Sequence, residues 1–570
     1  MIKERLYKIF RAIYLPVLFL LLLNSAPPFS SLQYNASFAG NLNAEAILGA
    51  NVDPVSTTIQ SVLASDKLGK DFFKDRKALE AFYKGRGFEP VWVRPIGVTV
   101  EAHDLYRVIE KSWTHGLNPN SYHFDKIKEL IDAGPGAQMA DLELVMADAY
   151  IRLGKDLSGI RVDPSALNTS REFWKQSLAS ETLLQKLGSR QSVKDIFEDI
   201  APKGMTYKRI QEALIQMVNA PAPPYEAVLP IRLEVLLRPY DRHRAVELLR
   251  VRLGVRGAAS SDPYVYDDSV VAAVIQFQRD HGLKPDGIIG SQTLDLLNIK
   301  RDKKLNQLIA NLERLRWVDE ARPDTFIVVN IPSATLWAIE NNRVAFEMPV
   351  IVGRQKRETN IFITEIHGVR FNPNWTVPPT IKKQDILPKL QENPAYLKEK
   401  GMELIKGHGS DAVSVDSESI DWANLSSSDL RSLRMVQTPG EHNPLGKVRV
   451  LMPNKYNIYL HDTNHPEYFN QSSRALSSGC IRLQEPERVA EFIMKHKAGW
   501  DYERMSSVLA SGKMSDQYIS NPIPVYLLYY TVWINDEGEL VYGSDLYNYD
   551  EKLIKTLSKL DGIFIPVDNA

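Results

Sequence analysis

The sequence predicts an α+β protein of several domains, with a helical part first and a mostly-β part after it. Three observations lead to this fold class. Apolar residues recur at helical spacing through residues 60–220, a compact three-helix pattern occupies residues 240–298, and β-rich runs dominate residues 320–500. A chain of 570 residues is also long enough for more than one domain.

The helical part is expected over residues 60–220. Its two clearest helices are predicted over residues 71–84 and 141–157, where one face is apolar. No cluster of chemically reactive side chains is apparent in it. We therefore interpret this part as a helical scaffold domain.

The unit over residues 240–298 has apolar faces at residues 245–253 and 268–278. Gly282 is placed to end the second helix, Asp286 and Gly287 make a tight turn, and Ser291 is the expected N-cap of the third helix. A stiff proline-rich stretch at residues 219–224 separates this unit from the helical domain. The pattern predicts a separate three-helix module.

The β-rich domain contains an insertion and is followed by a C-terminal segment. Strands are predicted at residues 326–331, 335–339, 346–352 and 448–452. A helical and polar insertion at about residues 378–430 interrupts them and is too long for a plain connector, so we expect it to cap a groove. Residues 501–570 are expected to pack on the scaffold or the β-rich domain.

Composition and the N-terminus limit the function classes. The 69 basic and 70 acidic residues nearly cancel, so no net field attracts nucleic acid. Residues 1–40 run from basic to apolar to small residues, the order of an export signal. The same segment would serve as a membrane anchor if it is not cleaved, and this alternative stays open. It would then be the chain's one contact with a membrane.

Cys480 is the only cysteine in the chain. An exported protein with one cysteine has no internal disulfide, and a free thiol is a liability in an oxidising compartment. The alternative is a buried thiol that has no chemical role and only packs in the core. Its setting in a turn of small residues favours a nucleophile instead, with His461, at the end of a predicted strand over residues 456–461, as its general base.

The turn itself would supply the other elements of acyl transfer. Backbone N–H groups of Ser478, Gly479 and Cys480 could stabilise the oxyanion, and the imidazole is expected to lower the pKa of the thiol below 7. Arg474 and Arg482 could hold a substrate carboxylate, or could be structural.

A zinc site is the rival interpretation, with His461, His465 and Cys480 as ligands. The spacing of the two histidines suits a helix. Pro466 follows His465 directly and argues against a helix there, so no metal and no cofactor are predicted.

The motif Ser477-Ser478-Gly479-Cys480-Ile481-Arg482, with His461 before it, resembles the active site of L,D-transpeptidases with a YkuD-type catalytic domain. The segments 437–440, 443–446 and 459–463 are similar to that family as well, and residues 240–298 resemble its peptidoglycan-binding module. The whole layout resembles the large YcbB-like subtype. Many YkuD domains have histidine before the Gly-Cys pair where this chain has Ser478, a residue common in the large subtype.

The resemblance implies a reaction, partners and a location. Cys480 would attack the L-centre carbonyl of diaminopimelate in a donor tetrapeptide stem, release D-alanine, and pass the acyl group to a diaminopimelate amine, forming a 3-3 cross-link. Tyr459 and Trp375 would join Arg474 and Arg482 in binding substrate. The protein would act in the periplasm or cell envelope. Water or a lipoprotein lysine as acceptor, and a non-catalytic wall-binding protein, remain alternatives. A backbone carbonyl or the Asp462 side chain would orient His461.

Overall fold

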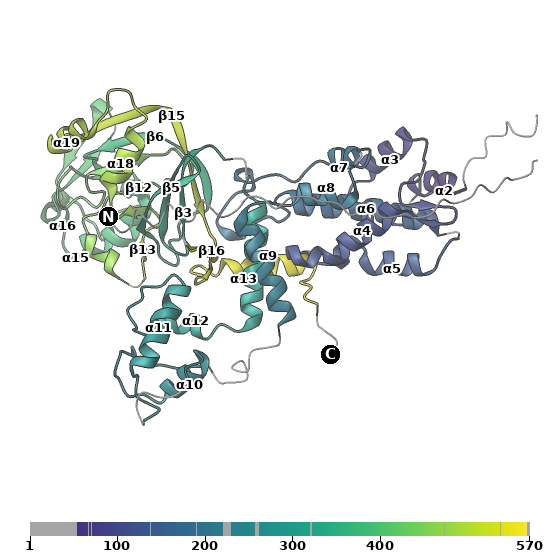
Figure 1. Ribbon diagram of the computed structural model, residues 1–570. Coiled ribbons are helices and arrows are strands. Elements are labelled where there is room, and N and C mark those ends of the chain that lie inside the picture. The colour runs from purple at the N-terminus through teal and green to yellow at the C-terminus, as the bar shows by residue number, and fades with distance from the viewer. Residues whose placement is uncertain are drawn as a thin grey trace, which may run out of the picture. The chain divides into compact units, whose positions relative to one another are not determined.

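The computed structural model describes residues 54–566. Within that span it leaves out residues 66–67, 70, 137, 190, 221–229, 257–261, 320–321, 408, 472 and 536. The expected signal or anchor over residues 1–40 lies outside the described residues. Among the helices of the described part, none is both long and apolar enough to cross a membrane. The predicted fold class is confirmed: a helical part, a three-helix module and a mostly-β part follow one another along the chain (Figure 1).

The helical part is organised around one buried helix, α6 (Met139–Ser158), which contacts several of its neighbours. The other elements are α2 (Pro54–Leu63), α3 (Arg76–Gly85), β1 (Val93–Arg94), β2 (Gly97–Val98), α4 (Val100–Glu110), α5 (Phe124–Asp132), α7 (Ser180–Leu187), α8 (Val193–Ile200) and α9 (Met205–Asn219). The helix predicted from residue 71 begins only at Arg76. Asp75 is its N-cap, and its side chain accepts a hydrogen bond from the Ala78 N–H, which ends the turn before the helix.

The three-helix module consists of α10 (Ala245–Arg252), α11 (Asp268–Asp280) and α12 (Ser291–Leu297). Gly282 has φ +61°, as expected for the residue that ends α11. The expected N-cap at Ser291 is wrong, because Gly290 is the extended capping residue and Ser291 already belongs to the helix. The Gln278 side chain holds the following turn by donating to Ile288 O and accepting from Gly287 N.

Nine strands form the main sheet of the mostly-β part. They are β3 (Thr325–Asn330), β4 (Thr335–Glu340), β5 (Arg343–Gly353), β6 (Phe362–Phe371), β11 (Val448–Leu451), β12 (Leu460–His461), β13 (Ala475–Ser477), β14 (Ile481–Leu483) and β15 (Ser515–Leu528). Their order is β13-β5-β14-β12-β11-β6-β15-β3-β4, and β4 also pairs with β5. Apart from β13, the strands therefore form a closed ring of pairings. The C-terminal segment is integral to the ring, because β15 lies between β6 and β3.

Alternation along the strands divides apolar from polar side chains. Val448, Val450, Leu460 and Ile481 are buried and share one apolar cluster with residues of α18 (Pro486–Met494), which contacts β6, β11 and β15. The residues between them in the strands, Arg449 and Arg482, are only partly buried. One face of this sheet region therefore holds the core, and the other carries polar chemistry.

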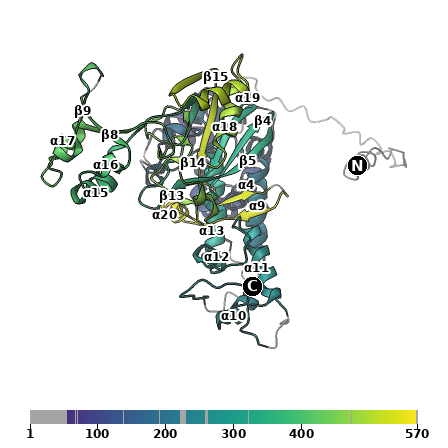
Figure 2. The same cartoon turned by 90° about the vertical axis from the view of Figure 1, so that its left-hand side faces the viewer.

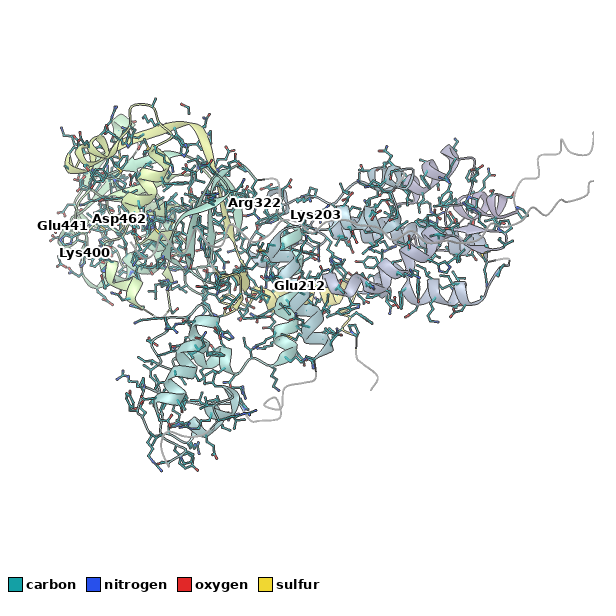
Figure 3. The ribbon with its side chains drawn as sticks, in the orientation of Figure 1. Lys203, Glu212, Arg322, Lys400, Glu441 and Asp462 are labelled. Atoms are coloured by element: carbon teal, nitrogen blue, oxygen red, sulfur yellow. The ribbon has the colours of Figure 1, made fainter. Side chains whose placement is uncertain are left out.

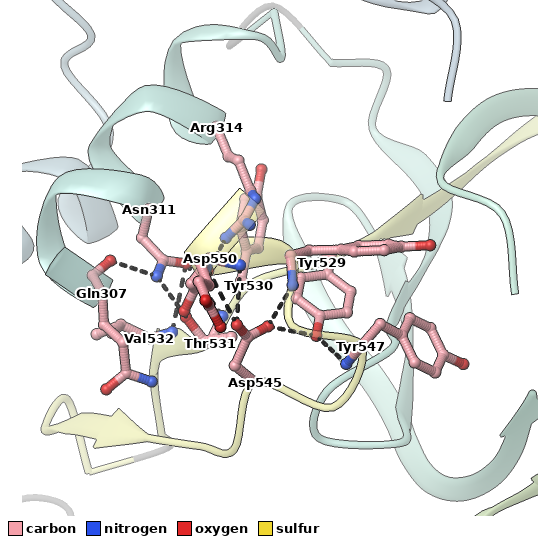
Figure 4. Close-up of polar contacts among 12 residues, drawn as sticks. Gln307, Asn311, Arg314, Tyr529, Tyr530, Thr531, Val532, Asp545, Tyr547 and Asp550 are labelled. Atoms are coloured by element: carbon pink, nitrogen blue, oxygen red, sulfur yellow. Dashed lines mark hydrogen bonds and ion pairs between the residues drawn. The ribbon is translucent and has the colours of Figure 1, made fainter. Parts of the chain in front are cut away.

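A buried helix and the C-terminal segment are joined by a polar network (Figure 4). Asn311 of α13 (Arg301–Arg316) accepts from the Thr531 N–H at 3.1 Å, and Arg314 pairs with Asp550 of α20 (Tyr549–Leu560). Tyr529 donates to Asp545 and accepts from the Tyr547 N–H, each at 2.7 Å. The hairpin β16 (Val532–Ile534) and β17 (Leu540–Tyr542) and the helix α19 (Tyr502–Ala510) complete the C-terminal elements. The network fixes Tyr547, which matters for the site below.

The insertion forms a group with its own small sheet and core (Figure 2). Its elements are β7 (Trp375–Thr376), α14 (Pro379–Ile381), the π-helix η7 (Lys382–Ile386), α15 (Leu387–Glu392), α16 (Tyr396–Glu399), β8 (Met402–Lys406), β9 (Val413–Val415), α17 (Ser427–Ser432) and β10 (Leu433–Gln437). The sheet order is β7-β10-β8-β9. Buried Lys382 donates to the carbonyls of Leu430 and Leu433, each at 2.6 Å, and so ties the two ends of the insertion together.

Candidate active site

Two short strands bring Cys480 and His461 to the same face of the sheet. β12 ends at His461, and β14 begins directly after Cys480. They pair in parallel, with Leu460 opposite Ile481 and His461 opposite Arg482. Leu460 and Ile481 point into the core, so the residues on either side of them point to the opposite face. Cys480 and His461 are therefore both on the polar face, with His461 opposite Arg482 and Cys480 two residues before Arg482 in the sequence.

The strand predicted over residues 456–461 is wrong except for its last two residues. Asn454 holds residues 456–458 in a turn, because its side-chain oxygen accepts from Tyr456 N and Ile458 N. Its amide nitrogen donates to Ile458 O at 2.7 Å. Asn457 has φ +55°, which a strand does not allow. The alternating pattern of the sequence arises from this side-chain-stabilised turn.

A backbone carbonyl orients His461. Its Nδ1 lies 2.5 Å from Asp462 O, which leaves Nε2 as the nitrogen free to accept a proton. The Asp462 carboxylate has a different task, since it accepts from Lys447 N at 2.7 Å and Thr463 N at 2.6 Å. Asp462 is labelled in Figure 3. Of the two partners considered for the imidazole, the carbonyl is the one present.

Gly446 makes room for this arrangement. Its φ is +56°, and a Cβ there would lie 2.1 Å from Asp462 Oδ2. Any larger residue must displace the side chain of Asp462, the residue whose backbone carbonyl holds His461. This explains why a glycine is needed in the segment over residues 443–446.

Burial favours the neutral forms of both His461 and Cys480. Desolvation, together with the charges of Arg482 and Arg449, lowers the pKa of His461 to about 3 despite its bond to Asp462. Desolvation also raises the pKa of the Cys480 thiol, against the lowering effects of the Tyr459 N–H and of Arg449 and Arg482. The expectation that the thiol has a pKa below 7 is therefore wrong for this structure. At neutral pH the site holds a thiol and a neutral imidazole that can act as a base.

The thiol is partly exposed and faces Asn457 O at 3.8 Å. No hydrogen bond between the thiol and either ring nitrogen of His461 is present in the described structure. The thiol is therefore directed at the Asn457 carbonyl and not at the imidazole in this structure.

The small residues of the turn have distinct roles. Ser477 Oγ donates to Cys480 O at 2.6 Å and accepts from Gly479 N at 3.0 Å, so the Gly479 N–H is already engaged inside the turn. For the backbone N–H groups of Ser478 and Cys480, the described residues offer no hydrogen-bond partner. Of the three expected oxyanion donors, the Gly479 N–H is thus engaged elsewhere, and those of Ser478 and Cys480 remain candidates.

The loop after β5 supports this turn from behind. Thr359 Oγ1 donates to Gly479 O at 2.8 Å and accepts from Gly353 N at 2.9 Å. Tyr547, which the C-terminal network fixes, donates to Gly353 O at 2.5 Å. The position of the nucleophile turn therefore depends on residues far from it in sequence.

The two arginines predicted to bind substrate lie in different surroundings. Arg474 donates to the carbonyls of Ser333 and Ala334, at 2.9 and 3.2 Å, which fits the structural alternative. Arg482 lies on the polar face, where its guanidinium carbon is 6.0 Å from the centre of the Tyr468 ring. Of these two arginines, only Arg482 lies beside the Cys480 thiol.

Sequence reasoning missed Arg449. Its guanidinium stacks on Tyr459, with 3.9 Å between the guanidinium carbon and the ring centre, and its buried Nε has no hydrogen-bond partner in the described structure. Arg449 and Tyr459 line a hollow of about 530 Å³, together with His367, Leu451, Met452, Pro453, Asn454, Asn457 and Tyr518. Desolvation lowers the pKa of Arg449. The alternation of Val448, Arg449 and Val450 was the one signal that this side chain leaves the core.

Tyr459 lies next to the Cys480 thiol, because its backbone N–H hydrogen-bonds to the sulfur. The predicted substrate-binding role of Tyr459 and Trp375 stays a prediction, and among the described residues no contact of Trp375 with the thiol is found. Trp375 is in β7 and packs against the core of the insertion. The proposed zinc ligand His465 pairs instead with Glu467 at 2.8 Å and stacks on Tyr468. In the part of the chain that the structure describes, no three His, Cys, Asp or Glu side chains gather as a metal site.

Comparisons with known proteins match three segments of the chain. Residues 324–505 match the family described as "L,D-transpeptidase catalytic domain", named YkuD. Residues 77–214 match "Scaffold domain", and residues 242–297 match "Putative peptidoglycan binding domain". The chain thus carries a YkuD-type catalytic domain, a scaffold domain and a peptidoglycan-binding domain.

One curated relative and two solved structures are similar to parts of this chain. A Haemophilus influenzae protein named "Putative L,D-transpeptidase" is 34% identical over 254 residues, which are 45% of this chain and 50% of that protein. The chain spans about half the length of this curated relative. Crystal structures of L,D-transpeptidases from Stackebrandtia nassauensis and Xylanimonas cellulosilytica are 12% and 14% identical, covering 51% and 52% of this chain and 97% and 99% of theirs. Their TM-scores are 0.19 and 0.15, so the assignment rests on the sequence matches.

Proposed function

From the YkuD-type catalytic domain that this chain carries, we propose that the protein is a peptidoglycan L,D-transpeptidase that forms 3-3 cross-links through a cysteine acyl-enzyme. The observation that carries the proposal is the parallel pairing of β12 with β14. It places a partly exposed thiol and an oriented, neutral imidazole on one polar face. This is the minimum equipment for acyl transfer by a cysteine.

The first half of the reaction forms the thioester. His461 Nε2 takes the proton of the Cys480 thiol while the sulfur attacks the carbonyl carbon of the donor stem. The N–H groups of Ser478 and Cys480 stabilise the oxyanion, a contribution typically worth about 3 kcal/mol per donor. Collapse breaks the amide bond, and the leaving D-alanine amine takes the proton from His461.

The second half transfers the acyl group. The amine of another stem attacks the thioester carbonyl, and His461 accepts a proton from that amine. The carbon–sulfur bond breaks, and the proton returns to the sulfur of Cys480. Both half-reactions use the same base, which suits a histidine that is neutral before each attack.

Charge on the polar face fits an anionic substrate. Arg449 and Arg482 flank the thiol without a carboxylate partner among the described residues, whereas the nearby Arg370 is paired with Asp516. Stem peptides carry several carboxylates, and guanidinium groups bind carboxylates well. We assign Arg449 and Arg482 to this role, and leave Arg474 to the structural one.

The remaining domains support an envelope location. A peptidoglycan-binding domain would hold the catalytic domain near its polymeric substrate and raise the effective stem concentration. We propose that residues 1–40 export the protein and that it acts in the periplasm. Water or a lipoprotein lysine as acceptor would give hydrolysis or protein anchoring by the same site.

Product analysis tests the proposal. Purified protein is incubated with disaccharide-tetrapeptide, and products are separated and weighed by mass spectrometry. A cross-linked dimer lacking one D-alanine is expected. Tripeptide alone would identify a carboxypeptidase, and unchanged substrate would favour a wall-binding protein without catalysis.

A further inference from the structure

Arg357 connects the capping insertion to the nucleophile turn. It lies in the loop after β5 that also supports the turn through Arg354 N, which donates to Ser477 O at 3.0 Å. Its Nη1 donates to Ser478 Oγ at 2.9 Å. On its other side, Nη2 donates to Asp385 Oδ1 and to Gln384 Oε1, both at 2.7 Å. The Arg357 guanidinium thus contacts both the nucleophile turn and the capping insertion.

Arg357 bridges a π-helix of the insertion at one end and the residue before Gly479 and Cys480 at the other. Asp385 and Gln384 belong to the π-helix η7 of the insertion, a helix type that is rare and often found at functional sites. Both Nη atoms of Arg357 reach the Asp385 carboxylate, which is a bidentate pair. Ser478, at the other end, precedes Gly479 and Cys480 directly.

The ion pair between Arg357 and Asp385 is partly shielded from solvent. The Arg357 side chain is 12% exposed and that of Asp385 is 37% exposed. The hydrogen bond from Arg357 also lowers the pKa of Asp385, so the carboxylate is charged throughout the neutral range. A partly buried bidentate pair orders both partners better than a fully exposed one.

We propose that Arg357 is a positioning residue that couples the capping insertion to the nucleophile turn. With Asp385 in place, the guanidinium is held against Ser478 Oγ, and the Ser478 and Cys480 N–H groups keep the orientation that oxyanion binding needs. When the insertion moves away, Arg357 loses its anchor and the turn loosens. The site is therefore complete only when the insertion is in contact with it.

This inference rests on the proposed function for its catalytic consequence, but its structural part can be measured separately. Four variants of the full chain are compared: Asp385→Asn, Arg357→Gln, Arg357→Lys, and the double variant that combines Asp385→Asn with Arg357→Gln. Glu392→Gln is the control, because Glu392 is an exposed acid in α15 of the same insertion. Hydrogen exchange over residues 475–480 and the rate of Cys480 alkylation by iodoacetamide report on the turn. Product formation from disaccharide-tetrapeptide gives kcat and KM.

Asp385→Asn is expected to speed exchange over residues 475–480 and to lower kcat about tenfold, with KM within twofold. The control should change neither. In the Arg357→Gln background, Asp385→Asn should have no further effect, because the bridge is already lost. Restoration of most of the wild-type kcat by Arg357→Lys would agree with a positioning role for the charge.

Equal effects of Asp385→Asn with and without Arg357 would overturn the inference, as would unchanged exchange over residues 475–480. If the wild-type protein forms no product, the proposed function fails. The coupling is then decided by exchange and alkylation alone.

Discussion

Replacing Thr359 with Val should loosen the nucleophile turn although the side chain keeps its size. The Thr359 hydroxyl makes two buried hydrogen bonds, one to Gly479 O at 2.8 Å and one from Gly353 N at 2.9 Å. Valine makes neither, so one carbonyl and one N–H are left without partners. Each unpaired buried group costs about 1–3 kcal/mol, so the catalytic domain should lose about 2–6 kcal/mol.

Thr359→Ser is the matched control, because it keeps the hydroxyl and loses only a methyl group, at a cost of about 1 kcal/mol. Scanning calorimetry measures the temperature of the unfolding transition that includes the nucleophile turn. In a domain of this size, each kcal/mol corresponds to about 2–4 °C in Tm. Thr359→Val should therefore lower one transition by about 4–24 °C, and Thr359→Ser by much less.

Activity should follow the same order. A turn that shifts by a few tenths of an ångström misplaces the oxyanion donors, so Thr359→Val should lower kcat more than tenfold while Thr359→Ser stays within threefold. Equal stability and equal kcat in the two variants would refute the view that this hydroxyl holds the turn.

Three other predictions concern the site. Because the pKa of the Cys480 thiol is raised and His461 is neutral, the rate of alkylation of the single cysteine by iodoacetamide should keep rising above about pH 8.5. His461→Gln should leave this pH profile unchanged. A plateau of the rate near pH 7 would show a thiolate–imidazolium pair. Gly446→Ala should lower kcat/KM more than tenfold by displacing Asp462, whereas Gly401→Ala, with a similar φ of +62° and open space around it, should not; equal losses would show a backbone effect only. Exhaustive chelation should leave kcat/KM unchanged, and loss of activity that zinc restores would favour a metal mechanism.

The local parts of the fold could be predicted from the sequence. Helices and strands with clear apolar periodicity lie close to their expected positions, and the Asn341-Asn342 turn between β4 and β5 has the positive φ values typical of such turns. The errors arose where side chains compete with the backbone pattern. Asp75 delays a helix, and Asn454 replaces most of a strand with a turn.

The candidate site was predictable only in its nucleophile and base. Cys480 stood out as a lone thiol in a small-residue turn, and His461 as the last residue of a predicted strand over residues 456–461. Thr359 and Arg357 act through contacts with residues that are more than a hundred positions away in sequence, and no local pattern distinguishes them from other surface or core residues. For Arg449, the alternation with Val448 and Val450 indicates only that its side chain leaves the core. Their roles depend on strand order and register, which periodicity does not specify.

The direction of the pKa shifts of Cys480 and His461 could not be predicted from the sequence either. An imidazole beside a thiol was expected to lower the pKa of the thiol. In the folded protein, desolvation is the largest effect on both groups, and it favours their neutral forms. Burial depends on the whole fold, so this result required the structure.

The most direct test of the account is the mass of the intact protein after brief exposure to disaccharide-tetrapeptide. A population heavier by the substrate minus D-alanine is expected, with the added mass located on Cys480 by peptide mapping. Cys480→Ala should show no added mass while its Tm stays within a few degrees of the wild type. Cross-linked product formed by Cys480→Ala, or an adduct on another residue, would contradict the cysteine acyl-enzyme.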